Sequence, residues 1–210
     1  MGASELEIAG NLRRMTEPTR QFDLGTLGGS QPPEERPDRR PVSWTGGADL
    51  GMLLLRLGVG GLFFAHGMQK VFGMWGGLGL SATTGIVAAH GFTSQASTLA
   101  WLLGGGELIL GAMIVLGLLT PFAAAGLLAI KIVAVVVKWG TVPFYAAAAP
   151  NALELDVLLG LGAAALLFTG AGRIALDRGR TWQRRPLPWA SLCLIIGVGV
   201  ALAVLLGLRR

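Results

Sequence analysis

Eight ionisable side chains lie within or beside the apolar stretches of the sequence. They are Arg56, His66, Lys70, Glu107, Lys131, Lys138, Glu154 and Asp156. A charge at the centre of a membrane helix costs about 2.5–3.5 kcal/mol on insertion scales, so such residues usually pair with one another or mark a ligand or ion path. The chemistry open to this set is ion pairing, proton exchange through the histidine, and binding of an anionic or quinoid ligand.

The spacing of the basic residues predicts that they share helix faces. At about 100° per residue, Arg56, His66 and Lys70 fall within an arc of about 80°. Lys131 and Lys138 are seven residues apart and share a face in the same way. Two polar stripes on two different helices are therefore expected.

Depth in the membrane predicts which charges can meet. From a rise of about 1.5 Å per residue, we expect Arg56 and Glu107 to differ in depth by only about 6 Å, which a long arginine can bridge. This pair is either a structural ion pair or part of a ligand site. Glycines 104–106 directly precede Glu107 and let a helix or ligand approach it. The sequence thus predicts a polar pocket among the first four helices, open toward the outer leaflet or the periplasm.

Five apolar stretches must position these residues, and each is close to the roughly 20 helical residues that cross a hydrocarbon core. They are Leu50–Met68, Leu99–Leu119, Phe122–Val137, Ala152–Gly170 and Trp189–Leu208. Only Thr120 and Pro121 separate the second stretch from the third, which predicts a tight antiparallel hairpin. The predicted fold is all-α and integral to the membrane, with a four-helix bundle over 48–177 and an additional transmembrane helix at 189–210.

The remaining segments differ in composition. Residues 1–47 are rich in charge, proline and glycine and are expected to form a disordered tail. Residues 72–97 are glycine-rich, with a helical core near 82–90, and are expected to lie in the membrane interface. Arginines in the tail and in the loop at 178–188 are separated by four spans, so both should lie on one side. The positive-inside rule predicts that this side is the cytoplasm. The membrane is expected to be the plasma (inner) membrane.

Composition excludes several classes of function. The 210 residues have a mean hydropathy of +0.61 and only 14% charged residues, against roughly 25% in soluble domains. The arginines cluster at a few places, which argues against a nucleic-acid partner. The single cysteine, Cys193, is expected to be a small core residue, and a dithiol mechanism is excluded. No dinucleotide fingerprint, haem ligand pair or metal-ligand spacing is present, so no metal and no intrinsic cofactor are predicted.

Several short motifs together resemble the DoxX family. They are Leu53–Gly58 with Arg56, Ala65–Gly73 with His66 and Lys70, Gly106-Glu107, Leu116–Pro121, Glu154, and Gly170–Asp177. The resemblance spans about residues 50–177 and implies a small four-helix membrane protein. Founding members are linked to thiosulfate:quinone oxidoreductase, so it also implies a place in a redox system. The long tail and the fifth helix depart from the short family pattern.

The charges and the resemblance together lead to a functional hypothesis. The protein would be a membrane subunit of a redox system that binds quinone or a similar lipid-soluble ligand and docks a partner enzyme. The ligand-binding candidates are Arg56, His66, Lys70, Glu107, Lys131 and Glu154, and Glu154 is preferred to Asp156 because the resemblance falls on it.

Alternatives remain open at this point. His66 and Lys70 could instead form an interfacial cap, with Lys70 extending toward the headgroups. The whole protein could be a non-catalytic membrane scaffold or a small transporter. No catalytic residue is assigned, and oxidoreductase activity rests on the resemblance alone.

Overall fold

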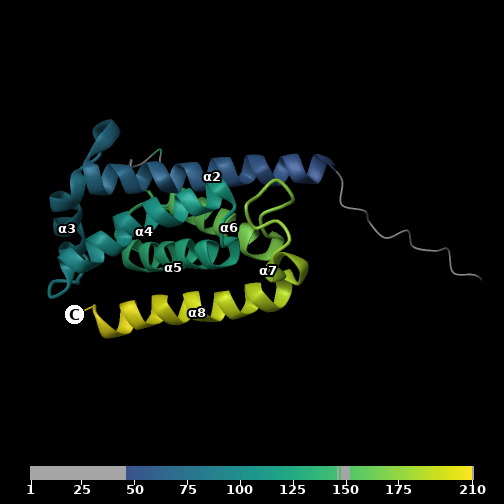
Figure 1. Cartoon of the computed structure of the whole chain (residues 1–210). Helices are drawn as coiled ribbons and strands as arrows, with labels where there is room; N and C mark the ends of the chain where they lie inside the picture. Colours follow the sequence, from purple (N-terminus) through teal and green to yellow (C-terminus); the bar gives the residue numbers. More distant parts are fainter. Residues whose placement is uncertain (1–45, 146, 148–151, 210) are drawn as a thin grey trace, which may run out of the picture. The chain divides into compact units, whose positions relative to one another are not determined.

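A computed structural model of the chain describes residues 46–145, 147 and 152–209, and their regular structure is entirely helical (Figure 1). The elements are α2 (Gly46–Phe72), the 3-10 turn η2 (Met74–Gly76), α3 (Gly79–Ala89), α4 (Ala96–Leu116), α5 (Thr120–Lys138), α6 (Leu153–Thr169), α7 (Thr181–Arg184) and α8 (Pro186–Gly207). The predicted disordered tail lies outside the described residues, except for positions 46 and 47, which begin α2.

The five long helices correspond to the five predicted apolar stretches. Four of them, α2, α4, α5 and α8, are long and apolar enough to cross a membrane. Helix α6 has 17 residues, at the lower end of the range that can cross a hydrocarbon core. The all-helical prediction is therefore confirmed, and four of the five predicted spans meet both the length and the composition expected of a transmembrane helix.

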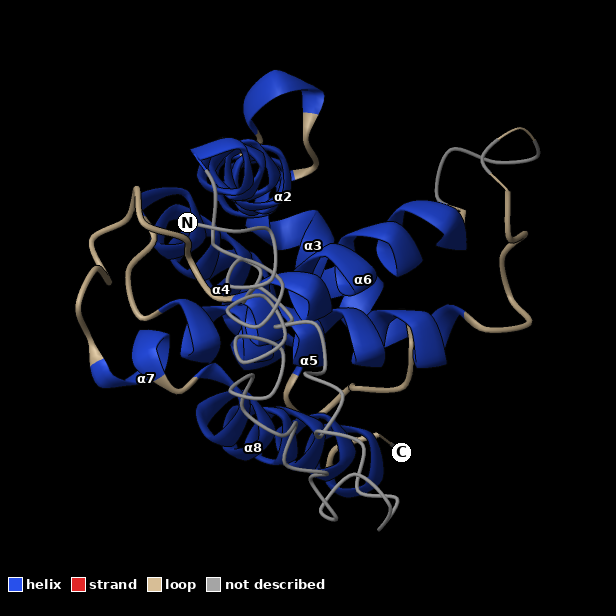
Figure 2. Ribbon diagram, turned by 90° about the vertical axis from the view of Figure 1, so that its right-hand side faces the viewer, coloured by secondary structure: helices blue, strands red, loops and turns tan. Residues whose placement is uncertain are grey.

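Helix α5 is the central helix of the bundle. It packs against α4, α6 and α8, while α2 packs mainly against α4. Figures 1 and 2 show α2 and α8 at opposite edges, with the other long helices between them. The core that joins them is built from small and aliphatic side chains, including Ala123, Ala124 and Ala125 of α5 and Cys193 of α8. Cys193 is thus a core residue, as predicted.

The predicted hairpin between the second and third spans is confirmed. Helix α4 ends at Leu116, and the next residue, Gly117, adopts the left-handed conformation with φ 66°. The N–H of Gly117 donates to Ile114 O at 3.0 Å and that of Leu118 to Met113 O at 2.8 Å, which satisfies the last carbonyls of the helix. Pro121 then lies in the first turn of α5, where no N–H donor is needed.

Close contact between α2 and α4 depends on glycines at the helix crossing. A Cβ atom at Gly60 would lie 2.9 Å from Gly111 O, and one at Gly67 would lie 2.6 Å from the Cα of Leu108. Glycines allow backbones to approach this closely where lipid provides no hydrophobic drive for association. They also fix the register, with Gly60 opposite Gly111 and Gly67 opposite Leu108.

Gly67→Ala is expected to lower the free energy of unfolding by about 2 kcal/mol, because the new methyl group forces α2 away from α4. Gly61→Ala is the matched control, since a Cβ there meets nothing within 4 Å. The control should leave stability unchanged or raise it slightly. Thermal unfolding in detergent micelles measures both, and equal midpoints for the two variants would contradict the close-contact argument.

Both ends of the bundle are defined by contacts between distant segments. Asp49 of α2 accepts a hydrogen bond from the backbone N–H of Arg173 at 2.8 Å. The start of α2 and the arginine-containing loop after α6 therefore lie at the same end, as predicted. At the other end, α3 packs against α2 and α4, and Thr83 Oγ1 donates to Gly79 O at 2.8 Å and lies 3.3 Å from Lys70 O.

Candidate functional site

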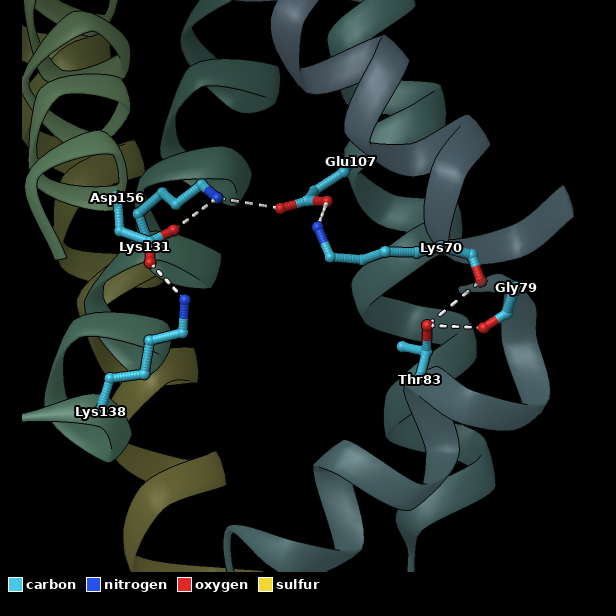
Figure 3. A network of polar contacts seen from close by, with 7 residues as sticks. All are labelled: Lys70, Gly79, Thr83, Glu107, Lys131, Lys138 and Asp156. Carbon is cyan, nitrogen blue, oxygen red and sulfur yellow. Dashed lines mark hydrogen bonds and ion pairs between the residues drawn. The ribbon is translucent and has the colours of Figure 1, made fainter. Parts of the chain in front are cut away.

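Five charged side chains from four helices form a continuous chain of ion pairs (Figure 3). Lys70 of α2 pairs with Glu107 of α4, whose other oxygen accepts from Lys131 of α5 at 3.1 Å. Lys131 also binds Asp156 of α6 at 2.9 Å, and Asp156 binds Lys138 at 2.7 Å. Charges of opposite sign alternate along the whole chain, which links α2, α4, α5 and α6.

The centre of this ion-pair chain is fully enclosed. Glu107 is 0% exposed and Lys131 4%, whereas the side chains of Lys70 and Lys138 at its ends are 28% and 26% exposed. The Lys131 ammonium also lies 5.1 Å from the centre of the Phe63 ring, a favourable cation–π distance. Each buried charge of this ion-pair chain therefore has an opposite charge beside it, as burial in a medium of low dielectric constant requires.

Local sequence explains how the helices hold these side chains. Lys131 and Lys138 lie on one face of α5, as their seven-residue spacing predicts, and Asp156 bridges them. A Cβ at Gly104 would lie 3.1 Å from Lys70 Cβ, so the small residue lets the Lys70 side chain pass alongside α4. The expectation that the glycines before Glu107 allow a close approach is confirmed at this position.

His66 lies near the ion-pair chain without belonging to it. It is half-buried and within electrostatic range of Lys70 and Glu107, but its ring makes no hydrogen bond to any residue in the described part of the chain. Lys70, in turn, points inward to Glu107. The interpretation of Lys70 as a side chain extended toward the headgroups is therefore wrong.

The expected contact between Arg56 and Glu107 is also wrong. Arg56 is 2% exposed and donates from Nη1 to Ala171 O at 2.7 Å and from Nη2 to Val115 O at 3.2 Å. The glycine-fixed register places Glu107 near the level of Gly67, so Arg56 lies about 17 Å away along α2. The depth estimate failed because it assumed where each span starts, whereas packing sets the register.

The preference for Glu154 over Asp156 is wrong as well. Asp156 is the residue that pairs with Lys131 and Lys138, and it is 8% exposed. Glu154 is only half-buried and takes no part in the ion-pair chain. The two carboxylates do point in different directions, as their 200° separation requires, but α5 lies on the side of Asp156.

A second buried polar site, which the sequence analysis did not identify, surrounds Asp177. Its two oxygens accept hydrogen bonds from the backbone N–H groups of Leu119 at 2.8 Å and Thr120 at 2.7 Å. Asp177 is 2% exposed and interacts electrostatically with Arg56. It thus satisfies the free donors at the start of α5, where no side chain of the helix itself provides a cap. The available signal was the motif Gly170–Asp177, which ends in this aspartate.

An apolar groove lies between α3, α4, α5 and α8. It has a volume of about 420 Å³ and follows α5 from Phe122 to Lys138, with Cys193 and Val200 on its α8 side. Lys138 and His90 are the polar residues at the end where α5 stops. This groove differs from the predicted polar pocket among the first four helices, because the additional helix α8 forms one of its walls and its lining is apolar.

Comparison with known proteins identifies the family. The sequence profile of the DoxX family matches residues 51–139, which run from the second turn of α2 to the end of α5. A Bacillus subtilis (strain 168) protein named "Putative oxidoreductase CatD" is 33% identical over 129 residues, 61% of this chain and 86% of that protein. No solved structure matches significantly. Because the chain matches the family profile and covers most of this relative, it belongs to the DoxX family.

Proposed function

We propose that this multi-pass membrane protein is a subunit of a redox system that binds a quinone or a similar lipid-soluble ligand in the apolar groove. The observation that carries the proposal is the position of Lys138. This residue lines the groove and also ends the ion-pair chain. One side chain therefore joins an apolar channel, suited to an isoprenoid tail, to a buried set of charges.

The dimensions and walls of the groove suit such a ligand. From Phe122 to Lys138 it follows about 24 Å of helix, long enough for several isoprene units in an extended conformation. Its walls are aliphatic side chains from α4, α5 and α8, which favour an apolar tail. The tail would lie along α5 with the quinoid ring near Lys138.

Polar groups at that end can interact with a quinone ring. The Lys138 ammonium can donate to a quinone carbonyl oxygen in addition to Asp156. The Nδ1 atom of His90 lies 2.8 Å from Ile86 O. In the neutral tautomer, Nδ1 donates to this carbonyl oxygen and Nε2 can accept a hydrogen bond from a hydroxyl group of the reduced ligand. His90 replaces His66 as the proposed proton-exchanging residue.

Electrons would come from a partner protein, because residues described here supply no redox centre of their own. The quinone would gain two electrons from that partner and two protons, forming the quinol. The oxidoreductase name of the Bacillus subtilis relative supports a redox setting for the family. We place the protein in the bacterial plasma membrane with its N-terminus in the cytoplasm, as the arginine distribution favours.

A groove-filling variant tests the proposal. Ala134 lines the groove and is half-buried, so Ala134→Phe should obstruct the site. Val136→Phe on the same helix is the control, because Val136 is 45% exposed and lies outside the lining. At a ligand concentration of about 100 Kd, quinone should stabilise the native protein and the control by about 2.7 kcal/mol, and Ala134→Phe much less.

The probe is a short-chain ubiquinone or menaquinone with one isoprene unit, titrated into purified protein in mild detergent during thermal unfolding. The ring without its tail serves as a ligand control and should bind more weakly. Absence of any quinone-dependent shift in the native protein, or the same shift in both variants, would refute binding in this groove.

A scaffold role is the second candidate, and the closed ion-pair chain favours it. Glu107 and Lys131 are enclosed and mutually paired, as expected of charges that hold helices together. The same enclosure gives no support to a transport path through Glu107. A scaffold would retain a partner protein during purification from native membranes while showing no response to quinone, which separates the two candidates.

A further inference from the structure

The loop between α6 and α8 lines a second, open pocket at the end of the bundle where α2 begins. Its volume is about 520 Å³, and three arginines line it: Arg173, Arg178 and Arg184. Thr169, Gly172 and Gln183 complete much of the remaining lining. This pocket is separate from the apolar groove, and no step of the quinone proposal uses it.

Gln183 gives the pocket a defined shape. Its side-chain amide donates to Gly172 O, and its Oε1 accepts from the backbone N–H of Gly179 at 3.2 Å. Gly172 and Gly179 both have positive φ, 74° and 85°, which a glycine adopts without strain. The Gln183 side chain thus connects two turns of the loop by hydrogen bonds, and the arginines project from a constrained backbone.

Within the described residues, the positive charges of this pocket outnumber the carboxylates beside it, although Asp49 accepts the backbone N–H of Arg173. None of its three arginine side chains forms an ion pair with a carboxylate in 46–145 or 152–209. The acidic residue within the loop, Asp177, is buried and occupied by the N–H groups of Leu119 and Thr120. An anion is therefore the complementary ligand.

Neighbouring aromatic residues indicate that the pocket lies at headgroup level. Trp182 and Trp189 contact each other and Phe122 edge to face, with ring centres 6.1–6.2 Å apart. The Trp182 indole Nε1 is buried and has no hydrogen-bond partner among the residues described. Indoles prefer the interface between hydrocarbon and water, and Pro186 of the pocket opens α8, a helix apolar enough to span the membrane.

We propose that this arginine pocket binds the phosphate diester of an anionic phospholipid. Guanidinium groups present planar pairs of N–H donors that match phosphate oxygens, and basic pockets beside transmembrane helices on the cytoplasmic side suit anionic headgroups. The acyl chains would lie against the exposed apolar side chains at the start of α8, such as Leu187, which is 65% exposed. The bound lipid would join the loop to α8.

Native mass spectrometry of the detergent-solubilised full chain tests this site. The probes are phosphatidylglycerol and phosphatidylcholine with identical acyl chains, and inorganic phosphate as a competitor. Arg178→Gln with Arg184→Gln removes two pocket charges. The matched control, Arg180→Gln with Arg185→Gln, removes two exposed charges of the same loop that do not line the pocket.

The native protein and the control should retain phosphatidylglycerol in preference to phosphatidylcholine, and the pocket variant should bind it about 30-fold more weakly. Equal losses in both double variants would overturn the site, because attraction to the loop's net charge would then explain binding. Equal retention of both lipids by the native protein would overturn it without any variant. Displacement of the lipid by millimolar inorganic phosphate would overturn the assignment to a lipid headgroup.

Discussion

Glu107→Gln is expected to lower the free energy of unfolding by about 3–5 kcal/mol, the usual result of removing one partner from a buried ion pair. Among the residues that the structure describes, Glu107 is the only anion that pairs with both Lys70 and Lys131. Its loss leaves three lysines around Asp156 alone. The excess charge would lie in the centre of the bundle, where Glu107 is 0% exposed.

Thermal and denaturant unfolding in micelles, followed by tryptophan fluorescence, measures this effect. Glu154→Gln is the matched control, since it makes the same chemical change at a half-buried glutamate outside the ion-pair chain. Adding Lys70→Met to Glu107→Gln should recover part of the loss, because it removes the cation whose carboxylate partner has been lost. If Glu107→Gln proved as stable as Glu154→Gln, the ion-pair chain could not be what holds the four helices together.

Asp177→Asn is expected to cost about 3 kcal/mol, because each hydrogen bond to a buried charged group contributes about 1.5–3 kcal/mol. An asparagine offers one acceptor to the two N–H groups of Leu119 and Thr120 and places its own amide donor beside the other. It also removes the negative charge near Arg56. The first turn of α5 should therefore loosen before the rest of the bundle does.

Hydrogen exchange locates this effect as well as measuring it. Amides 119 and 120 should exchange faster in Asp177→Asn, while those in the middle of α4 keep their protection. Arg180→Gln, an exposed change three residues away, is the control and should alter neither exchange nor stability. Faster exchange throughout the bundle, with no preference for the start of α5, would contradict the capping role.

Sequence reasoning was most successful where hydropathy alone decides the structure. The five long helices match the predicted stretches to within a few residues, and the tight turn at Pro121 follows from its spacing. The shared face of Lys131 and Lys138 also follows directly from helical periodicity. These features are local, so no knowledge of a partner helix was needed to predict them.

The positions of the charges relative to one another depend on packing and could not be predicted in the same way. The sequence predicts Arg56 beside Glu107. The close contacts at Gly60 and Gly67 set a register between α2 and α4 in which Lys70 pairs with Glu107 instead. Choosing between Glu154 and Asp156 likewise requires knowing which side of α6 faces α5. Helical periodicity gives the angle between the two carboxylates but not the direction of the neighbouring helix.

The groove was missed for a related reason. Helix α8 was interpreted as an addition to a family core, because it has no charge and follows the resembling region. In the structure it contributes Cys193, Val200 and further small or branched residues to the groove wall. In the sequence of an apolar helix, residues that line a binding site look the same as residues that face lipid, because both are apolar.

The alternation of charge along the ion-pair chain also has a consequence for how the protein enters its membrane. In order of synthesis, α2 brings a cation, α4 an anion, α5 two cations and α6 an anion. Helices α4, α5 and α6 therefore each carry an ion-pair partner for a residue that has already been synthesised. The α4–α5 hairpin can insert into the membrane with Glu107 and Lys131 already paired. Helix α8 is synthesised last and carries no member of the ion-pair chain, so this chain of ion pairs is complete when α6 is in place.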